Sequence, residues 1–416
     1  MEYGCIGEHL THSFSKEIHN ALADYQYVLK ELSPDKLEGF IKERDFKAIN
    51  VTIPYKKDVI PYLDWISPEA ESINAVNTIV NKDGKLYGYN TDFYGLKSLV
   101  EKHNISLKGK RVAVLGSGGT SNTACAVSEN MGAASIIKVS RSERKGYITY
   151  EELYNDYSDV QIIINTTPCG MFPNTGESPV DLSEFTELEA VFDAVYNPLS
   201  SKLVLDARKT GVTAVGGLYM LVSQAAYAVE KFIDTPVNSN KIEKIYRSLF
   251  KDKMNIVLIG MPGCGKSTIG KALAQRLSKK LVDTDSLIVE RCGKSISDIF
   301  ADEGETSFRQ VEAEVIEEVS KLNGQIICTG GGAVLNEKNM ELLKSNGRLF
   351  FIDRPLDLLI ATADRPLSSN RADLERLYNQ RLSLYKKYAH VIVDGSAAVK
   401  NVAEEIEVDY NGYSCD

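Results

Sequence analysis

Short apolar runs alternate with segments of helical periodicity along most of the chain. The apolar runs Arg111–Leu115, Ser135–Val139 and Asn255–Ile259 have the length and the branched residues of buried strands. Helical spacing of apolar residues follows the first and the last of them, at 123–128 and 268–277. Alternation of this kind predicts an α/β protein with parallel sheets.

The chain has 416 residues, which is too long for one ordinary domain. A turn-rich segment at 234–240 leads into an amphipathic pattern at 241–250, and we expect a domain boundary at Lys251–Lys253. The first domain is predicted to span residues 1–250, with one α/β lobe at 1–103 and 216–250 and a Rossmann dinucleotide lobe at 104–215. The helix at 217–233 should return to the first lobe. The second domain is predicted at 254–416.

The segment Gly260–Ser267 matches the phosphate-binding pattern G-x-x-x-x-G-K-[ST] at every fixed position. A strand precedes it and a helix follows it, so its backbone N–H groups should surround a phosphate. Lys266 can reach the terminal phosphates, and Ser267 can hold Mg²⁺. The alternative is a chance glycine turn before a helix. The residues predicted to bind ATP here are Gly263, Cys264, Gly265, Lys266, Ser267 and Thr268.

An earlier glycine loop follows the predicted strand at 111–115. It contains Gly116, Ser117, Gly118 and Gly119, but Ser121 replaces the third glycine of the dinucleotide fingerprint. The next strand leads into Ser140, Arg141 and Arg144, where an NAD site usually carries an acidic residue. Arginine favours the 2′-phosphate of NADP instead. Solvated loop charges are the alternative.

Upstream, polar clusters stand at 12–15, 50–56, 75–78 and 90–92. Together they could surround a small polyhydroxylated acid. Lys56 and Asp92 are the acid–base candidates, because a lysine held by a carboxylate can protonate a ketone oxygen during hydride transfer. The alternative is a solvated lysine and a helix-capping aspartate.

Residues 1–250 resemble the shikimate dehydrogenase family in an ordered series of motifs, which are Ser13–Ser15 with Ile18–Asn20, Asn50–Lys56, Ala75–Thr78, Asn90–Asp92, Ile164–Met171, Asp193–Pro198 and Gly216–Gln224. The resemblance implies NADP-dependent reduction of 3-dehydroshikimate at C3, with Lys56 and Asp92 as the catalytic pair. It implies that Ser13 and Ser15 bind the substrate carboxylate and that Thr52, Asn77 and Gln224 contact ring hydroxyls. It places Asn165, Thr166 and Gly217 on the cofactor side, with Tyr196 near the substrate. The family's usual alanine is Ser117 here, and Phe93–Tyr94 stand where smaller residues are common.

Two carboxylates, Asp283 and Asp285, follow an apolar run in the second domain. If the strand persists, both side chains point to the same side; the alternative is an N-cap pair before a helix. Further along stand Gly304–Arg309, the triple glycine Gly330–Gly332, the polar stretch 363–371, which suits a lid, and Arg381 on a helical pattern. Arg371 and Arg376 are interpreted as surface charges.

Residues 254–416 resemble shikimate kinase in these motifs, which implies a fold of the nucleoside-monophosphate-kinase type. The resemblance implies that Asp283 helps to hold Mg²⁺ through water and that Asp285 binds and polarises shikimate hydroxyls. Arg309 and Arg381 would bind the carboxylate with Gly331 and Gly332, and Arg365 would close over the transferring phosphate. The two resemblances agree, since the first reaction makes shikimate and the second phosphorylates it. Quinate or NAD use in the first domain, and a metabolite-sensing regulator built from enzyme domains, are the alternatives.

Composition limits the remaining function classes. A hydrophobic content of 43% and a charged content of 25% are typical of soluble globular proteins. The net charge of −9 argues against nucleic acid as a partner. The 7 cysteines form no C-x-x-C pair, so we expect free thiols in a reducing compartment. No signal peptide or membrane span is expected, and the predicted location is the cytoplasm; monomer and homodimer are both left open.

Overall fold

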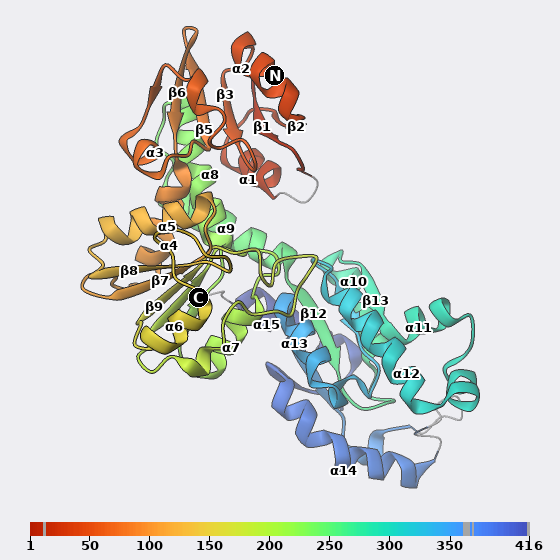
Figure 1. The fold of residues 1–416 in the computed structure, drawn as a ribbon. Helices are drawn as coiled ribbons and strands as arrows, with labels where there is room; N and C mark the ends of the chain where they lie inside the picture. Colours follow the sequence, from red (N-terminus) through yellow and green to blue (C-terminus); the bar gives the residue numbers. More distant parts are fainter. Residues whose placement is uncertain (11–13, 361–366, 368–369, 414–416) are drawn as a thin grey trace.

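The structure is a computed structural model that describes residues 1–10, 14–360, 367 and 370–413. These residues form three β-sheets, and each sheet lies within one of the segments expected from the sequence. Figure 1 shows the first lobe mainly in red and orange, the Rossmann lobe from orange to yellow-green, and most of the C-terminal domain in cyan and blue. The α/β fold class is therefore confirmed.

The first lobe is built on a mixed six-stranded sheet with the order β2-β1-β3-β5-β6-β4. β3 and β5 pair in antiparallel fashion, as do β5 and β6, while the pairs β1–β2, β1–β3 and β4–β6 are parallel. Its strands are β1 (Tyr3–Gly7), β2 (Tyr27–Glu31), β3 (Ala48–Val51), β4 (Trp65–Ile66), β5 (Thr78–Lys82) and β6 (Lys85–Tyr89). Its helices are α1 (Ser15–Leu22), α2 (Pro34–Glu43), α3 (Pro68–Ile73) and α4 (Thr91–Lys102).

The Rossmann lobe has a wholly parallel sheet with the order β11-β10-β9-β7-β8. The three inner strands β7, β9 and β10 are almost entirely buried, which explains why they appear in the sequence as continuous apolar runs. The elements are β7 (Arg111–Leu115), α5 (Gly119–Asn130), β8 (Ser135–Val139), α6 (Tyr150–Asp156), β9 (Ile162–Asn165), β10 (Ala190–Asp193), α7 (Lys202–Lys209) and β11 (Thr213–Val215).

The C-terminal domain is a second parallel sheet with the order β13-β14-β12-β15-β16. A kink at Gly304 (φ 81°) divides its longest helix, α12. The strands are β12 (Asn255–Ile259), β13 (Leu281–Asp283), β14 (Ile326–Cys328), β15 (Gly347–Asp353) and β16 (Val391–Asp394). The helices are α10 (Lys266–Leu277), α11 (Thr284–Cys292), α12 (Ile296–Ser320), α13 (Glu337–Asn346), α14 (Arg371–Tyr388) and α15 (Val399–Gly412).

Two helices join these units. α8 (Leu218–Ile233) leaves the Rossmann lobe and packs against α4 and α1 of the first lobe. α9 (Ser239–Lys253) lies between the first domain and the C-terminal domain in Figure 1. One buried apolar cluster includes Ile18 of α1, Val222 of α8, Tyr246 of α9 and Ile256 of β12. The two domains therefore share hydrophobic core. None of the helices in the described ranges has the length and apolar character needed to cross a membrane.

The contact between α4 and α8 depends on Gly95. A Cβ added there would lie 2.7 Å from the carbonyl oxygen of Met220 and 2.8 Å from Cβ of Gln224. We expect Gly95→Ala to lower the free energy of unfolding by about 1–3 kcal/mol, because it forces the helices apart. Thermal unfolding of the purified full-length chain measures this effect.

Gly39→Ala on α2 is the matched control. Position 39 is exposed, and no atom lies within 4 Å of an added Cβ, so the better helix propensity of alanine should stabilise by up to about 1 kcal/mol. If both variants shift the melting temperature in the same direction, the close approach of α4 and α8 does not limit stability.

Candidate functional site

The first candidate site is a cavity of about 460 Å³ between the first lobe and the Rossmann lobe. The described residues that the sequence predicted to bind the dehydrogenase substrate all line this cavity. They are Ser15, Thr52, Lys56, Asn77, Asp92, Tyr196 and Gln224. Ser13 lies outside the described residues. Residues from positions 15 to 224 therefore meet in one place, although the sequence separates them widely.

Lys56 and Asp92 form an ion pair inside this cavity, with Nζ and Oδ2 2.6 Å apart. Their side chains are 20% and 13% exposed, so the pair is shielded from solvent yet reachable. Lys56 follows β3, and Asp92 stands in the first turn of α4. The N-cap of α4 is Asn90, whose side chain accepts from the Phe93 amide, so the alternative of a capping Asp92 is wrong.

Buried amides and hydroxyls support the wall of the cavity. Asn77 Oδ1 accepts from the backbone and the hydroxyl of Thr91. The same hydroxyl lies 3.4 Å from Gln224 Oε1, which connects β5 and α4 with α8. Asn50, which was not among the predicted site residues, also lines the cavity and accepts from Tyr27 Oη at 2.7 Å. Asn50 belongs to the Asn50–Lys56 motif, and this could have indicated that it lies in the site.

Two loops of the Rossmann lobe complete the cavity. One contributes Met171, Phe172 and Pro173, and the other contributes Asn197 beside Tyr196. The sequence motifs contained or bordered these segments, but no local pattern shows which of their side chains reach a cavity in another lobe. Sequence reasoning therefore missed these four residues.

The glycine loop after β7 has room for a phosphate group. Gly116 adopts φ 113°, and an added Cβ would lie 2.7 Å from Thr166 Oγ1, so glycine is required there. Gly118 and Gly119 face open space, and α5 begins at Gly119. Backbone N–H groups at a helix N-terminus suit a pyrophosphate.

The residues expected at the NADP end gather around this loop. The Arg144 guanidinium donates to Ser117 O at 3.1 Å and stacks over Tyr147, while Arg141 is exposed. Ser140 is buried and accepts from the Ser142 amide. Ser121, at the place of the third glycine, is also buried, and its hydroxyl donates to Gly116 O at 2.7 Å. Ser121 therefore stabilises the glycine loop through this hydrogen bond. The N-terminus of α5, which follows the loop, stays accessible to a ligand.

The structure corrects the prediction that Asn165 contacts the cofactor. It is fully buried; Nδ2 donates to Asp193 Oδ1 at 2.9 Å, and Oδ1 accepts from the amide and the hydroxyl of Thr167. A side chain enclosed in this way supports the loop and cannot contact a cofactor. Thr166 is partly exposed and donates to Leu115 O, and Gly217 is buried against the carbonyl of Ala194. Their contacts with a cofactor stay predictions.

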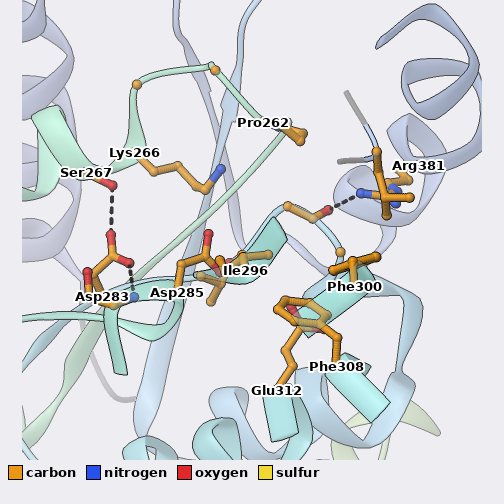
Figure 2. Close-up of a pocket in the computed structure, with 18 of the residues that line it drawn as sticks. Pro262, Lys266, Ser267, Asp283, Asp285, Ile296, Phe300, Phe308, Glu312 and Arg381 are labelled. Atoms are coloured by element: carbon orange, nitrogen blue, oxygen red, sulfur yellow. Dashed lines mark hydrogen bonds between the residues drawn. The ribbon is translucent and has the colours of Figure 1, made fainter. Parts of the chain in front are cut away.

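The second candidate site is a cavity of about 590 Å³ at the carboxyl ends of β12, β13 and β14. Figure 2 shows Lys266, Asp285 and Arg381 pointing into it from different elements. The predicted residues that line it are Gly263, Gly265, Lys266, Ser267, Thr268, Asp283, Asp285, Arg309, Gly331, Gly332 and Arg381. Arg365 and most of the expected lid lie outside the described residues.

The structure also corrects the prediction that Cys264 binds ATP. It is fully buried, and its backbone N–H donates to Met261 O at 3.2 Å. Its thiol lies beneath the loop, 3.8 Å from Lys266 Nζ, so Cys264 supports the loop and does not face ATP. Lys266 Nζ donates to the carbonyls of Gly260 and Met261 at 2.8 and 3.0 Å, which holds the ammonium group inside the loop.

The two aspartates do not share a strand, because β13 ends at Asp283. Asp283 is the N-cap of α11; Oδ1 accepts from the Ser286 amide, and Oδ2 accepts from Ser267 Oγ at 2.8 Å. Asp285 lies in the first turn of α11. Of the two alternatives that the sequence left open, the strand does not persist and Asp283 is a helix N-cap. Both carboxylates nevertheless line the cavity (Figure 2).

Two arginines, Arg309 and Arg381, also line this cavity. Arg309 donates to Glu312 Oε2 at 2.7 Å, and Arg381 donates to Gly331 O at 3.0 Å. Sequence reasoning missed Glu312, although its position three residues after Arg309 on a helix was a usable signal. Burial raises the pKa of Glu312, partly offset by the Arg309 charge. Arg376 pairs with Asp373, and Arg371 donates to Leu356 O, consistent with their interpretation as surface charges.

The fold and the two sites define a dinucleotide-dependent oxidoreductase followed by a phosphate-loop kinase. The chain belongs to the shikimate dehydrogenase family, and its C-terminal part carries a shikimate kinase domain. A model described as the shikimate dehydrogenase substrate binding domain matches residues 5–79, and one described as shikimate kinase matches residues 262–410. The resemblance drawn from the motifs is thereby confirmed.

Related proteins agree with this assignment. A shikimate dehydrogenase (NADP(+)) of Clostridium perfringens (strain 13 / Type A) is 38% identical over 264 residues, which cover 59% of this chain and 97% of that protein. Shikimate dehydrogenase 1 of Peptoclostridium difficile is 36% identical with a TM-score of 0.55, covering 60% and 98%. The shikimate 5-dehydrogenase of Thermus thermophilus in complex with NADP(H) and shikimate is 27% identical with a TM-score of 0.54, covering 60% and 99%.

The buried carboxyl of Asp193 should make stability depend on pH. Burial raises its pKa from 3.8 to about 6, although Ser201, the Val195 amide and Asn165 donate to it. The folded chain therefore holds a proton that the unfolded chain loses near pH 4, and ionisation lowers stability as the pH rises to about 6. Asp193→Asn has no such charge, and its amide can exchange hydrogen-bond roles with the Ser201 hydroxyl.

We expect the stability of Asp193→Asn relative to wild type to increase by about 2 kcal/mol between pH 4 and pH 7. Thermal unfolding of both proteins across this range measures the difference. A difference that stays constant with pH would contradict the raised pKa.

Proposed function

We propose that this chain catalyses two successive reactions, NADPH-dependent reduction of 3-dehydroshikimate to shikimate and ATP-dependent phosphorylation of shikimate to shikimate 3-phosphate. The Lys56–Asp92 pair inside a cavity of small-acid size carries the proposal for the first reaction. The family match at residues 262–410, together with the phosphate loop that opens into a separate cavity, supports the second.

In the first reaction, Lys56 donates a proton to the C3 oxygen as the carbonyl is reduced. Asp92 holds the ammonium group 2.6 Å away and keeps it directed into the cavity. Ser15, with Ser13, would bind the carboxylate, and Thr52, Asn77 and Gln224 would contact hydroxyls. NADPH would supply the hydride when bound. The loop at Gly116–Gly119, with Arg141 and Arg144, would hold its phosphates, and Thr166 and Gly217 would contribute to the cofactor side of the site.

In the second reaction, Asp285 would accept hydrogen bonds from the shikimate hydroxyls and polarise the one at C3. Arg309 and Arg381, beside Gly331 and Gly332, would bind the substrate carboxylate. Gly263, Gly265, Lys266 and Thr268 would hold the phosphates of ATP, and Arg365 would close over them. These groups position the reactants and neutralise charge, which phosphoryl transfer requires.

A magnesium ion fits the pair formed by Ser267 and Asp283. A hydroxyl and a carboxylate oxygen 2.8 Å apart, beside the phosphate loop, are oxygen donors of the kind that Mg²⁺ uses in nucleotide sites. Within the described residues no cluster of three or more metal-ligating side chains exists, so phosphate oxygens and water would complete the coordination. The ion would neutralise phosphate charge.

The two activities should separate by mutation. We expect Lys56→Ala to lower 3-dehydroshikimate-dependent NADPH oxidation by about 10²–10⁴-fold, because the proton donor is lost. Lys266→Ala should abolish only ADP formation from added shikimate. Spectrophotometric NADPH loss and coupled ADP detection, run separately on the same preparations, measure both.

Each variant serves as the folding control for the other. If wild type binds both substrates but shows neither signal, the chain is a metabolite-sensing regulator and the catalytic roles are wrong. Quinate with NAD⁺, compared with shikimate and NADP⁺ in the oxidative direction, tests the other alternative. A higher kcat/KM for quinate and NAD⁺ would reassign the first activity.

The Mg²⁺ assignment predicts a specific effect of Asp283→Asn. Asparagine keeps the N-cap bond to the Ser286 amide but removes the charge. We expect the Mg²⁺ concentration for half-maximal kinase activity to rise at least about tenfold, with unchanged thermal stability. Titration of kinase activity with Mg²⁺ gives this value, and an unchanged half-point would place the ion elsewhere.

A further inference from the structure

A helix of the kinase domain contacts both Rossmann loops that cover the dehydrogenase cavity. Phe172 and Asn197 line that cavity from the two loops. The Phe172 amide donates to Asn197 O at 2.9 Å, so the loops are joined directly. Displacing either loop would therefore disturb the other, together with Tyr196, which also lines the cavity.

The carboxyl end of α13 meets these loops. Asn346 Oδ1 accepts from the Leu199 amide at 2.8 Å, and Ser345 O accepts from the Ser200 amide at 2.9 Å. At the other loop, Leu342 lies over Gly176, with Cδ2 3.2 Å from the position of an added Cβ. Figure 1 shows α13 next to α7, which follows directly after Ser201. The kinase domain thus holds both loops at once.

Asn346 is well suited to fix a loop of the other domain. It is 2% exposed, and its Nδ2 is directed toward Ser320 O at 3.4 Å, which leaves Oδ1 for Leu199. Residue 347 begins β15, which pairs with β12 in the kinase sheet. The acceptor is therefore attached directly to the central sheet of the kinase domain.

We infer that Asn346, a residue of the kinase domain, is a positioning residue for the dehydrogenase site. Its side-chain amide holds the segment that carries Tyr196 and Asn197, and with Leu342 it fixes the part of the cavity wall that the two Rossmann loops form. The inference rests on the proposed function of that cavity. Asn346 is not among the residues that line the kinase cavity, so its loss should affect the dehydrogenase reaction selectively.

The test is steady-state kinetics of full-length Asn346→Ala, with shikimate oxidation by NADP⁺ and shikimate phosphorylation measured separately. The loop loses its anchor, so we expect the dehydrogenase KM for shikimate to rise about tenfold. The KM for NADP⁺ and the kinase kcat/KM should stay within about twofold, because the glycine loop and the kinase cavity are untouched.

Lys209→Ala is the matched control at the same interface. It removes an interdomain ion pair with Glu341 (2.5 Å) whose lysine side chain is 52% exposed. Pairs this exposed contribute little, so neither activity should change. Leu342→Ala tests the contact with the second loop, and it should reproduce the selective rise in KM for shikimate. Leu342→Met keeps the side-chain volume and should show no such rise.

An unchanged KM for shikimate in both Asn346→Ala and Leu342→Ala overturns the inference, and so does an equal fall of both activities, which would indicate a structural role. If Asn346→Ala fails to fold, Leu342→Ala decides by the same readout. A wild-type chain without shikimate-dependent NADP⁺ reduction would instead contradict the proposed function.

Discussion

Both sites depend on the same constraint, the parallel arrangement of strands around a central strand. β7 is flanked by β8 and β9, and β12 is flanked by β14 and β15. In each sheet the chain leaves the central strand through a glycine loop and enters a helix, at a point where neighbouring connections run to opposite sides. The loop at 260–267 lines the kinase cavity, and the loop at 116–119 leads directly into α5. Each loop therefore ends at a helix N-terminus, which attracts phosphate.

The two domains are not independent units joined only by a linker. α9 buries Tyr246 and Leu249 in an apolar cluster that includes kinase strands, while α13 hydrogen-bonds to the Rossmann lobe. Burial of this kind is non-directional and excludes water, whereas the bonds from Leu199 and Ser200 fix the register of the contact. The apolar cluster stabilises the association of the domains, and the hydrogen bonds determine their orientation.

The sequence allowed the fold class, the position of each sheet and many of the polar residues around both cavities to be predicted, because short motifs and apolar runs are local signals. Prediction from the sequence failed where contacts between residues far apart in the chain determine the environment of a side chain. Asn165 resembles a ligand contact in its motif, yet the neighbouring strand β10 places Asp193 against it and buries it. The position of Asp285, by contrast, follows from the local N-cap at Asp283, which the sequence offered as one of two alternatives. The contact between Asn346 and Leu199 joins residues 147 positions apart and has no local signature.

The kinase cavity also contains a buried charged side chain whose surroundings lower the stability of the free chain. Arg381 is 3% exposed, and burial lowers its pKa. Its Nε has no hydrogen-bond partner among the described residues, and its guanidinium donates to the carbonyl of Gly331. A buried guanidinium without a carboxylate partner is unfavourable. A ligand carboxylate would supply that partner, so part of the affinity for an acidic substrate would come from relieving an unfavourable arrangement already present in the empty cavity.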